Sequence, residues 1–303
     1  MKLRIAVEGL GACAGCEIAI LDLHEEIVSL LQDLEIDYAP ILMDKKSLNE
    51  NVDVLLLSGS VRNKHDAEEA VRLSEKAKIT IAFGSCASFG GIPGLANLYA
   101  TRELLERVYL TTESTDNKQG VLPSEEVPAL EQFVKPLKEW IKINYNIPGC
   151  PPQPKLVKEI FQMLLTGKPV TLSKKTVCDE CDLKREEKKI TRILRWGEGE
   201  PDSSRCLLEQ GYFCAGPATR AGCEAKCPAA LMPCRGCMGP PENVTDQGAK
   251  MVSAIASVAA IDEKNRVDPE QLAAMIKDVV GSFYRFTLPS SIISRKVSEE
   301  KIK

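Results

Sequence analysis

The sequence LRIAVEGLGACAGCEIAILD, residues 3–22, decides the fold of the N-terminal half of the chain. Its run Arg4–Val7 predicts a short apolar strand, and Gly9 and Gly11 then predict a turn. The segment after the turn carries apolar residues at spacings near three and four, which predicts a helix with one apolar face: Ile20, Ile27, Leu31 and Leu34. The chain therefore begins with a strand, a glycine-rich turn and a helix.

Strands and helices continue to alternate after this stretch. Further strands are predicted at Tyr38–Met43, Val54–Leu57 and Ile79–Phe83. Val54–Leu57 is a continuous apolar run, as expected of a strand that is buried on both faces. Helical patterns follow at Asp66–Lys76, Leu130–Ile141 and Leu156–Leu165. This alternation predicts an α/β fold, with a doubly wound parallel sheet of flavodoxin type over residues 1–167.

The character of the sequence changes after Gly167. Eight of the 12 cysteines fall between Cys178 and Cys237, in a segment rich in glycine and proline with little strand pattern. A segment of this composition buries little apolar surface, so we expect bound metal to hold it together. Residues 168–303 are predicted to form a second, small and irregular domain with few helices.

Two helices are predicted near the C-terminus. One covers Ala249–Ile261, and Asp268 caps a second helix that Pro269 opens. The polar tail SRKVSEEKIK, residues 294–303, is expected to be frayed or to bind a partner.

Composition excludes two classes of partner. The net charge is −4 and the pI is about 5.5, so the chain has no field that gathers nucleic acid or an anionic membrane. The N-terminus lacks the features of a secretory signal, and no apolar run approaches the roughly 18 residues of a spanning helix. We therefore expect a cytoplasmic protein. Disulfides are rare in that reducing compartment, so 12 cysteines beside two histidines indicate metal binding.

Four cysteines lie in glycine-rich turns of the N-terminal half: Cys13, Cys16, Cys86 and Cys150. The first two follow the first predicted strand, Cys86 follows the strand that ends at Phe83, and Cys150 lies in PGCPP before a helix. The carboxyl ends of parallel strands meet at one edge of a sheet, so four thiolates would converge there, as a cubane iron–sulfur cluster requires. Buried, unreactive thiols are the alternative. A dinucleotide loop is disfavoured because GLGACAG does not follow G-x-G-x-x-G.

The remaining cysteines are Cys178, Cys181, Cys206, Cys214, Cys223, Cys227, Cys234 and Cys237. They include two C-x-x-C pairs, CDEC and CRGC, in which one turn brings two thiolates to one metal centre. Twelve cysteines divide into three sets of four. The intervals alone do not settle the pairing, and they leave two structural zinc sites as a rival to iron–sulfur clusters.

Five motifs, in order, resemble the small subunits of nickel–iron hydrogenases. LGACAGCEIAILD resembles the first motif of that family, GSCASFGGIPG the second and IPGCPPQP the third. CLLEQGYFCAGPAT and PCRGCMGPP resemble the two blocks of its cluster-rich domain. The resemblance covers roughly residues 1–240 and is far more specific than any one C-x-x-C pair. It favours iron over zinc.

The resemblance implies three [4Fe–4S] clusters. The proximal cluster would be held by Cys13, Cys16, Cys86 and Cys150. The medial cluster would be held by Cys223, Cys227, Cys234 and Cys237, and the distal cluster by Cys178, Cys181, Cys206 and Cys214. Many members have histidine where Cys178 stands, so the distal site here would be all-thiolate, which lowers reduction potentials. Many also have proline in place of a fourth medial cysteine, and the medial cluster is [3Fe–4S] if Cys227 is not a ligand.

The resemblance also implies a function, as the electron-transfer subunit of a [NiFe] hydrogenase. A large partner subunit would hold the Ni–Fe site and cleave H2, and electrons would pass through the proximal, medial and distal clusters. The sequence looks most like the F420-non-reducing (methyl-viologen-reducing) enzymes of methanogens, whose partners are a [2Fe–2S] acceptor subunit and heterodisulfide reductase. No residue of this chain needs to be a catalytic acid. Glu17 is a candidate for proton exit, or a helix-start residue that suits the helix dipole.

Three alternatives stay open. The first is the small subunit of an F420-reducing hydrogenase. The second is a quinone-reductase or membrane-hydrogenase subunit; these carry one cluster and lack the second domain, so the segment Cys178–Cys237 counts against them. The third is a zinc-dependent binding protein, such as one that binds nucleic acid, and the missing basic patch counts against that interpretation.

Overall fold

The structure, a computed structural model, describes residues 2–186, 189–259 and 268–295. These residues form two compact units. The first unit comprises Met1–Lys168 together with the segment that begins at Thr287, and the second comprises Pro169–Phe286. Most of the predicted tail, and the last two residues of the predicted helix Ala249–Ile261, lie outside the described residues.

The segment after Thr287 lies against the first unit, although the sequence suggested that it belongs to the second domain. Asn97 Nδ2 donates a hydrogen bond of 3.1 Å to the carbonyl oxygen of Ser294. Pro289 packs closely on Gly90, and a Cβ added to Gly90 would lie only 2.3 Å from Cγ of Pro289. The chain therefore leaves the first unit and returns to it.

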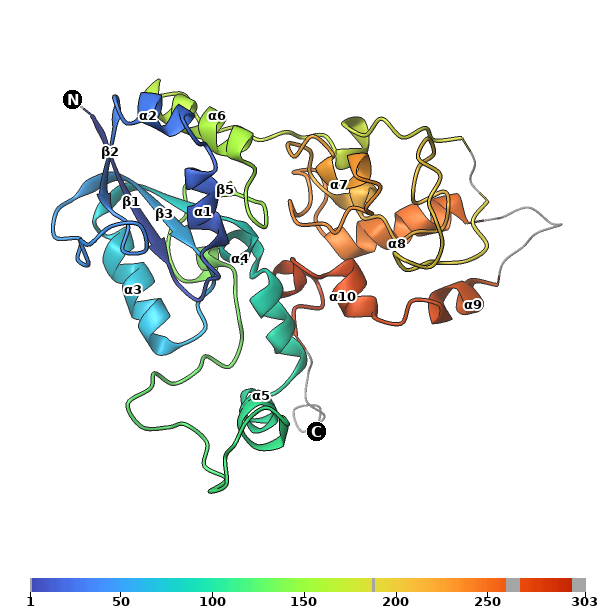
Figure 1. Ribbon diagram of the computed structural model, residues 1–303, viewed down its shortest axis with the longest axis horizontal. Helices are drawn as coiled ribbons and strands as arrows, with labels where there is room; N and C mark the ends of the chain where they lie inside the picture. The colour runs from blue at the N-terminus through green and yellow to red at the C-terminus, as the bar shows by residue number, and fades with distance from the viewer. Residues whose placement is uncertain (1, 187–188, 260–267, 296–303) are drawn as a thin grey trace. The chain divides into compact units, whose positions relative to one another are not determined.

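The first unit is built on a five-stranded, parallel sheet (Figure 1). Its strands are β1 (Leu3–Gly9), β2 (Leu34–Tyr38), β3 (Val52–Ser58), β4 (Ala77–Phe83) and β5 (Tyr145–Ile147). Their spatial order is β2-β1-β3-β4-β5, which is the flavodoxin-type order, so the predicted fold class is confirmed. The strand order reverses between β1 and β3, where folds of this type open a crevice at the carboxyl ends of the strands.

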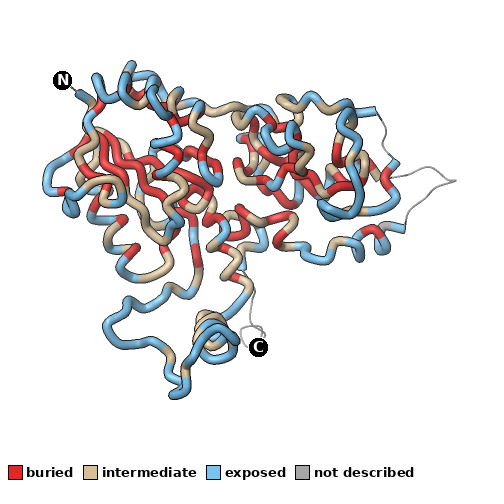
Figure 2. Tube along the Cα trace, in the orientation of Figure 1, coloured by how far each residue is buried: buried red, intermediate tan, exposed pale blue. Residues whose placement is uncertain are grey.

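Helices cover both faces of this sheet, and the strands between them are buried (Figure 2). The helices of this unit are α1 (Gly15–Leu21), α2 (Glu26–Leu30), α3 (Lys64–Ser74), α4 (Ser85–Phe89), α5 (Thr101–Glu106) and α6 (Pro154–Leu165). Of these, α5 lies apart from the sheet and buries no residue (Figure 1). Segments with 3-10 or π-helical geometry are η1 (Ile92–Leu98), η2 (Arg107–Thr111), η3 (Leu137–Glu139) and η6 (Leu288–Ser290). Ala6 of β1 packs on the α3 side, in one core cluster with Leu73. Ile5 points to the other face, where it shares a small cavity with Ile20 of α1 and Phe161 of α6.

The first predicted helix is wrong in its length. The helical pattern through Leu34 is interrupted, because α1 ends at Leu21 and His24 takes a left-handed conformation with φ of 51°. The N–H of Leu23 bonds the carbonyl oxygen of Ile20 at 3.3 Å, an i to i+3 bond that tightens the turn. Leu34 then begins β2 instead of ending a helix.

The second predicted strand, Tyr38–Met43, is displaced. β2 ends at Tyr38, and the N–H groups of Leu42 and Met43 both bond the carbonyl oxygen of Ala39 in a turn. Pro40 has no N–H to give to a strand ladder, which explains the early end. The other predicted strands, and the helices predicted at Asp66–Lys76 and Leu156–Leu165, are confirmed within a few residues.

The predicted helix Leu130–Ile141 is wrong except for the short turn η3. Its backbone instead bonds other segments. The N–H of Glu131 donates to the carbonyl oxygen of Arg62 at 2.9 Å, and the amide of Asn97 pairs with both backbone groups of Val134. Pro136 also removes a donor from the helical pattern. Tertiary hydrogen bonds therefore override the apolar spacing here.

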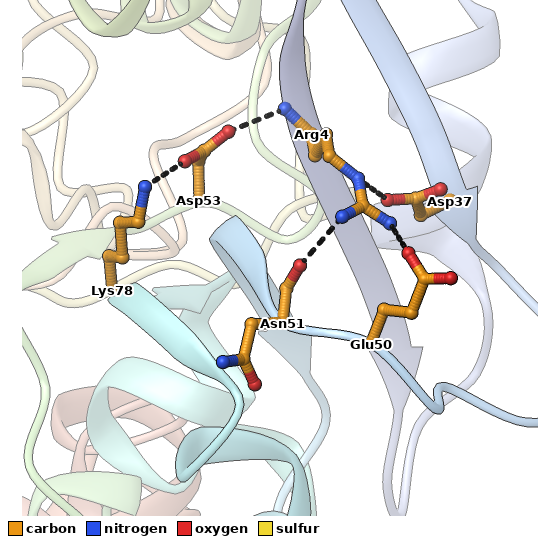
Figure 3. Close-up of polar contacts among 6 residues, drawn as sticks. All are labelled: Arg4, Asp37, Glu50, Asn51, Asp53 and Lys78. Atoms are coloured by element: carbon orange, nitrogen blue, oxygen red, sulfur yellow. Dashed lines mark hydrogen bonds and ion pairs between the residues drawn. The ribbon is translucent and has the colours of Figure 1, made fainter.

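Charged side chains join neighbouring strands of the sheet around Arg4 (Figure 3). Arg4 Nε pairs with Asp37 Oδ2 at 2.5 Å, and another guanidinium nitrogen pairs with Glu50 Oε2 at 2.6 Å. The N–H of Arg4 donates to Asp53 Oδ2 at 2.9 Å, and Lys78 Nζ lies 2.7 Å from the other oxygen of Asp53. These groups are partly exposed, so salt screens them and their main effect is to align β1, β2, β3 and β4.

The second unit has short helices and no strand among its described residues, 169–186, 189–259 and 268–286. The elements are α7 (Lys226–Ala229), α8 (Gln247–Val258), α9 (Pro269–Ala274), α10 (Val279–Phe283), η4 (Val177–Asp179) and η5 (Gly216–Ala218). The two predicted helices are confirmed as α8 and α9, and the side chain of Asp268 accepts a bond from the N–H of Glu270 as a cap. In the described residues of the two units, no helix is long and apolar enough to cross a membrane.

Candidate functional site

The loops that follow β1, β4 and β5 carry the four N-terminal cysteines. Cys13 lies between β1 and α1, and Cys16 is the second residue of α1. Cys86 is the second residue of α4, directly after β4, and Cys150 follows β5. Because all three strands are parallel, these loops leave the sheet at its carboxyl edge, on the side where α/β folds bind ligands.

The thiols of these four cysteines are close enough to affect one another's ionisation. Burial, followed by the charges of Glu17 and the other three thiols, raises the pKa of Cys16. Burial together with Cys150 and Cys13 raises the pKa of Cys86 to about 11. Burial and Cys13 also raise the pKa of Cys150. The four thiols therefore lie near one another at the carboxyl edge of the sheet.

Two glycines make room for these thiols. Gly84 has φ of 90°, and a Cβ at this position would lie 2.3 Å from Cys16 Sγ. Gly91 has φ of 57°, and a Cβ there would lie 2.5 Å from Cys86 Sγ. Any other residue would both strain the backbone and push a thiol out of place.

Backbone hydrogen bonds hold the cysteine loops in position. The N–H of Gly84 bonds the carbonyl oxygen of Ile147 at 2.7 Å, and the N–H of Ser85 bonds that of Gly149 at 2.9 Å. Ser85 Oγ in turn accepts from the N–H of Gly149 at 3.0 Å. The Cys86 and Cys150 loops are thus one rigid piece, as a preformed metal site needs.

The donor set fits a cationic cluster. At neutral pH, thiols with raised pKa values are protonated, and four adjacent thiolates repel one another unless a cationic centre lies between them. Binding iron in such a site displaces the thiol protons, so affinity for iron rises with pH until the thiols ionise by themselves. Four thiolates on one centre are the usual ligands of a cubane iron–sulfur cluster.

A second set of four cysteines comes together in the second unit: Cys178, Cys181, Cys206 and Cys214. All four line one small cavity whose other walls include Val177, Leu207 and Pro228. A Cβ on Gly216 would approach Cys178 Sγ to 3.1 Å, so this glycine also lies against the thiols. A dry, apolar cavity lined by four thiols is what an iron–sulfur cluster needs.

In this cavity too, burial and neighbouring thiols raise the pKa values of cysteines. Burial and then Cys214 and Cys206 raise the pKa of Cys178 to about 12. Burial raises the pKa of Cys214 to about 11, although backbone N–H groups of Gly216 and Cys234 bond its sulfur and act in the opposite direction. Such N–H groups also stabilise bound thiolates.

The last four cysteines fall into two pairs along the chain, Cys223 with Cys227 and Cys234 with Cys237. Burial raises the pKa of Cys223, with smaller contributions from Glu180 and then Cys227. Burial also raises the pKa of Cys234, to which the charge of Cys214 contributes more than that of Cys237. The N–H of Cys234 also lies 3.3 Å from Cys214 Sγ, so the second pair adjoins the cavity described above. Grouping these two pairs on one centre remains a prediction.

None of the 12 cysteines, all of which are described, forms a disulfide. Across the described ranges, no three or more histidine, cysteine, aspartate or glutamate side chains are arranged to hold a single metal ion.

Known proteins match this chain over nearly its whole length. A 47% identical relative, a subunit of the F420-non-reducing hydrogenase of Methanocaldococcus jannaschii, aligns over 98% of each chain. A 36% identical relative, aligned over 98% of this chain and 99% of its own, is the iron–sulfur subunit of the F420-non-reducing hydrogenase of Archaeoglobus profundus. The chain belongs to this family of F420-non-reducing hydrogenase subunits. Residues 13–164 of this hydrogenase subunit also match the family NADH ubiquinone oxidoreductase, 20 Kd subunit.

A solved structure also places this chain among hydrogenase subunits. The crystal structure of an NAD+-reducing [NiFe]-hydrogenase in the H2-reduced state contains a chain with 30% identity and a TM-score of 0.53. The match covers 56% of this chain and 96% of that one. The chain is therefore part of a hydrogenase, an oxidoreductase, in which it has an electron-transfer role, and its 12 cysteines and family indicate iron–sulfur clusters. These relatives argue against the zinc-protein alternative.

Glu17 of this hydrogenase subunit is buried beside the first cysteine site, with 2% of its surface exposed. Ser58 Oγ donates to Glu17 Oε1, and among the described atoms Glu17 Oε2 has no hydrogen-bond partner. Glu17 and Glu8 line one cavity of about 190 Å³. Sequence reasoning missed Ser58 and Glu8; the only signal was their place at or near the carboxyl ends of β3 and β1.

Proposed function

We propose that this chain conducts electrons in a [NiFe] hydrogenase, from H2 oxidation at the Ni–Fe site of a large subunit to an electron-acceptor subunit. The observation that carries the proposal is the pair of four-thiol sites, one at the carboxyl edge of the sheet and one in the apolar cavity of the second unit. Three bound [4Fe–4S] clusters would each accept and release one electron at a time.

The residues of this chain would hold, insulate and tune the clusters. The proximal ligands would be Cys13, Cys16, Cys86 and Cys150. The medial ligands would be Cys223, Cys227, Cys234 and Cys237, and the distal ligands Cys178, Cys181, Cys206 and Cys214. Apolar walls exclude water, and backbone N–H groups such as that of Cys234 reduce the charge on the sulfur they contact. A thiolate at Cys178 in place of a neutral ligand lowers the distal potential.

We propose the electron acceptor of this chain from the family to which the chain belongs. An F420-non-reducing enzyme passes its electrons to something other than F420, and we propose a [2Fe–2S] subunit linked to heterodisulfide reductase, in a cytoplasmic complex with no membrane or nucleic-acid partner. The relatives named F420-non-reducing favour this interpretation over an F420-reducing hydrogenase.

Iron analysis tests the proposal. Anaerobically purified chain in complex with its large subunit is expected to contain about 12 iron and 12 sulfide on this chain, after the Ni–Fe iron is subtracted, with negligible zinc. The variant Cys227→Ala is expected to retain about 11 iron, with the spectroscopic signature of a three-iron centre. An unchanged iron content and spectrum in Cys227→Ala would remove Cys227 from the ligands, and zinc in place of iron would refute the proposed function.

Glu17 is proposed to carry protons away from the large-subunit side. Glu17→Gln keeps the shape of the side chain and the acceptor for Ser58 Oγ, but it cannot exchange a proton. We expect H2 oxidation to fall about 10- to 100-fold, because an essential proton-transfer group typically contributes on that order or more. The measurements are H2-dependent dye reduction and iron per chain. Loss of activity with loss of iron, or full activity, would contradict this role.

A further inference from the structure

The second unit contains a cavity of about 320 Å³ that is separate from the cavity lined by four cysteines. Its walls come from residues 193–196, from residues 233–235, and from the end of α9 through α10. The volume falls within the range of ligand-binding pockets. All of its lining residues belong to the second unit.

Positive charge converges on this cavity. Asp278 is the one carboxylate among its lining residues. Four cationic side chains also line it: Arg195, Arg235, Lys277 and Arg285. Arg235 and Arg285 come from segments 50 positions apart in the sequence, and both line this one cavity. This cluster stands out in a chain whose net charge is −4. This surplus of positive charge favours an anionic occupant.

Large apolar side chains lie between these cations. Trp196 is 56% exposed and Met275 is 41% exposed, although both are large enough to be buried in a core. Trp196 Nε1 bonds the carbonyl oxygen of Leu231 at 3.4 Å, which holds the ring in the wall of the cavity. Tryptophan, methionine and arginine are the residue types enriched in protein–protein interfaces.

The chemistry favours protein carboxylates over a phosphate. Phosphate sites commonly use free N–H groups at a helix N-terminus. Here Asp278 caps α10, and its carboxylate accepts the N–H of Gly281 at 2.9 Å. The negative charge of Asp278 also repels a doubly charged phosphate more strongly than it repels a singly charged carboxylate. The cavity therefore suits an acidic segment with an apolar side chain.

The cavity also reaches a cluster ligand. Cys234 lines it, and the N–H of Cys234 bonds Cys214 Sγ, so the wall of the cavity adjoins two of the proposed cluster sites. We propose that this cavity is the docking site of an acidic electron-carrier protein, whose carboxylates contact Arg195 and Lys277 and whose apolar tip contacts Trp196. This inference rests on the proposed electron-transfer function. Each H2 gives two protons and two electrons, so two one-electron carriers are reduced per H2.

The test uses the assembled hydrogenase and an acidic plant-type [2Fe–2S] ferredoxin as the probe. The variant Arg195→Glu with Lys277→Glu is compared with a control of equal charge change outside the cavity, Arg192→Glu with Lys250→Glu. We expect the Kd for ferredoxin, measured by biolayer interferometry, to rise at least about tenfold in the cavity variant. The control should stay within about twofold, and the wild-type Kd should rise with salt.

Two further measurements separate the modes of failure. H2-dependent reduction of methyl viologen, a cation, should be unchanged in both variants. If the wild-type complex does not reduce methyl viologen with H2, that result contradicts the proposed function and says nothing against the docking site. The neutral variant Arg195→Gln with Lys277→Gln should give an intermediate Kd even if the charge-reversed chain folds poorly. Equal Kd values in all variants, or equal weakening in the control, would overturn the docking site. Pyrophosphate that quenches Trp196 fluorescence while ferredoxin does not bind would make it a small-anion site instead.

Discussion

Replacing Gly84 by alanine is expected to abolish the proximal cluster. A Cβ at this position would lie 2.3 Å from Cys16 Sγ, and the backbone has φ of 90°. The thiol must move, and the loop that also positions Cys86 must move with it. We expect iron to fall by about four per chain and H2-dependent dye reduction to fall roughly 100-fold or more. Iron analysis and dye reduction on the purified complex measure the two effects.

Gly167→Ala is the matched control for this variant. Gly167 also has a left-handed conformation, with φ of 65°, but an added Cβ would have no neighbour within 4 Å. Backbone strain alone should cost about 1 kcal/mol and leave the iron content unchanged. If Gly167→Ala loses as much iron as Gly84→Ala, general destabilisation explains the result and the contact with Cys16 does not.

Removal of iron is expected to unfold the second unit and to leave the first intact. Among the described residues of the second unit, the longest helix is α8, with 12 residues, and the others have six or fewer. Helices this short are not stable by themselves, so bound metal must supply much of the folding free energy. When a ligand that was present at 100 times its Kd is removed, the fraction of molecules in which the unit is unfolded rises about 100-fold. Trypsin should then cut at exposed sites such as Arg192 and Arg195 far faster.

A site in the first unit gives the internal reference. Lys118 is exposed in an irregular segment that depends on no cysteine, so its rate of cleavage should be the same with and without iron. The β-sheet of the first unit has its own apolar core and should remain resistant. Mass spectrometry of the fragments over time distinguishes the sites. Equal protection of Arg192 and Arg195 after iron extraction would show that packing alone stabilises the second unit.

Local patterns predicted the parts of the fold that depend on neighbouring residues. The strand before GACAGCE and the strand before GSC were found because a buried parallel strand reads as a continuous apolar run. The caps of α9 were found because Asp268 and Pro269 act within one turn of the helix. The helix predicted at Leu130–Ile141 failed because its backbone bonds Arg62 and Asn97, which no local pattern reveals.

The sequence by itself determined the class of fold, the number of thiols available for metal and the family, because strands, turns and motifs are written in short stretches of chain. Cysteine spacing alone left the grouping of the thiols in the second unit open, and only the family resemblance suggested one. The tertiary structure brings Cys178, Cys181, Cys206 and Cys214 to one cavity. Cys178 and Cys214 are 36 positions apart, and their contact depends on how the irregular segments pack. The cationic cavity was equally hidden, because Arg195 and Arg285 become neighbours only when α10 packs beside residues 193–196. Contacts across long stretches of chain depend on the packing of the whole unit, and no local spacing encodes them.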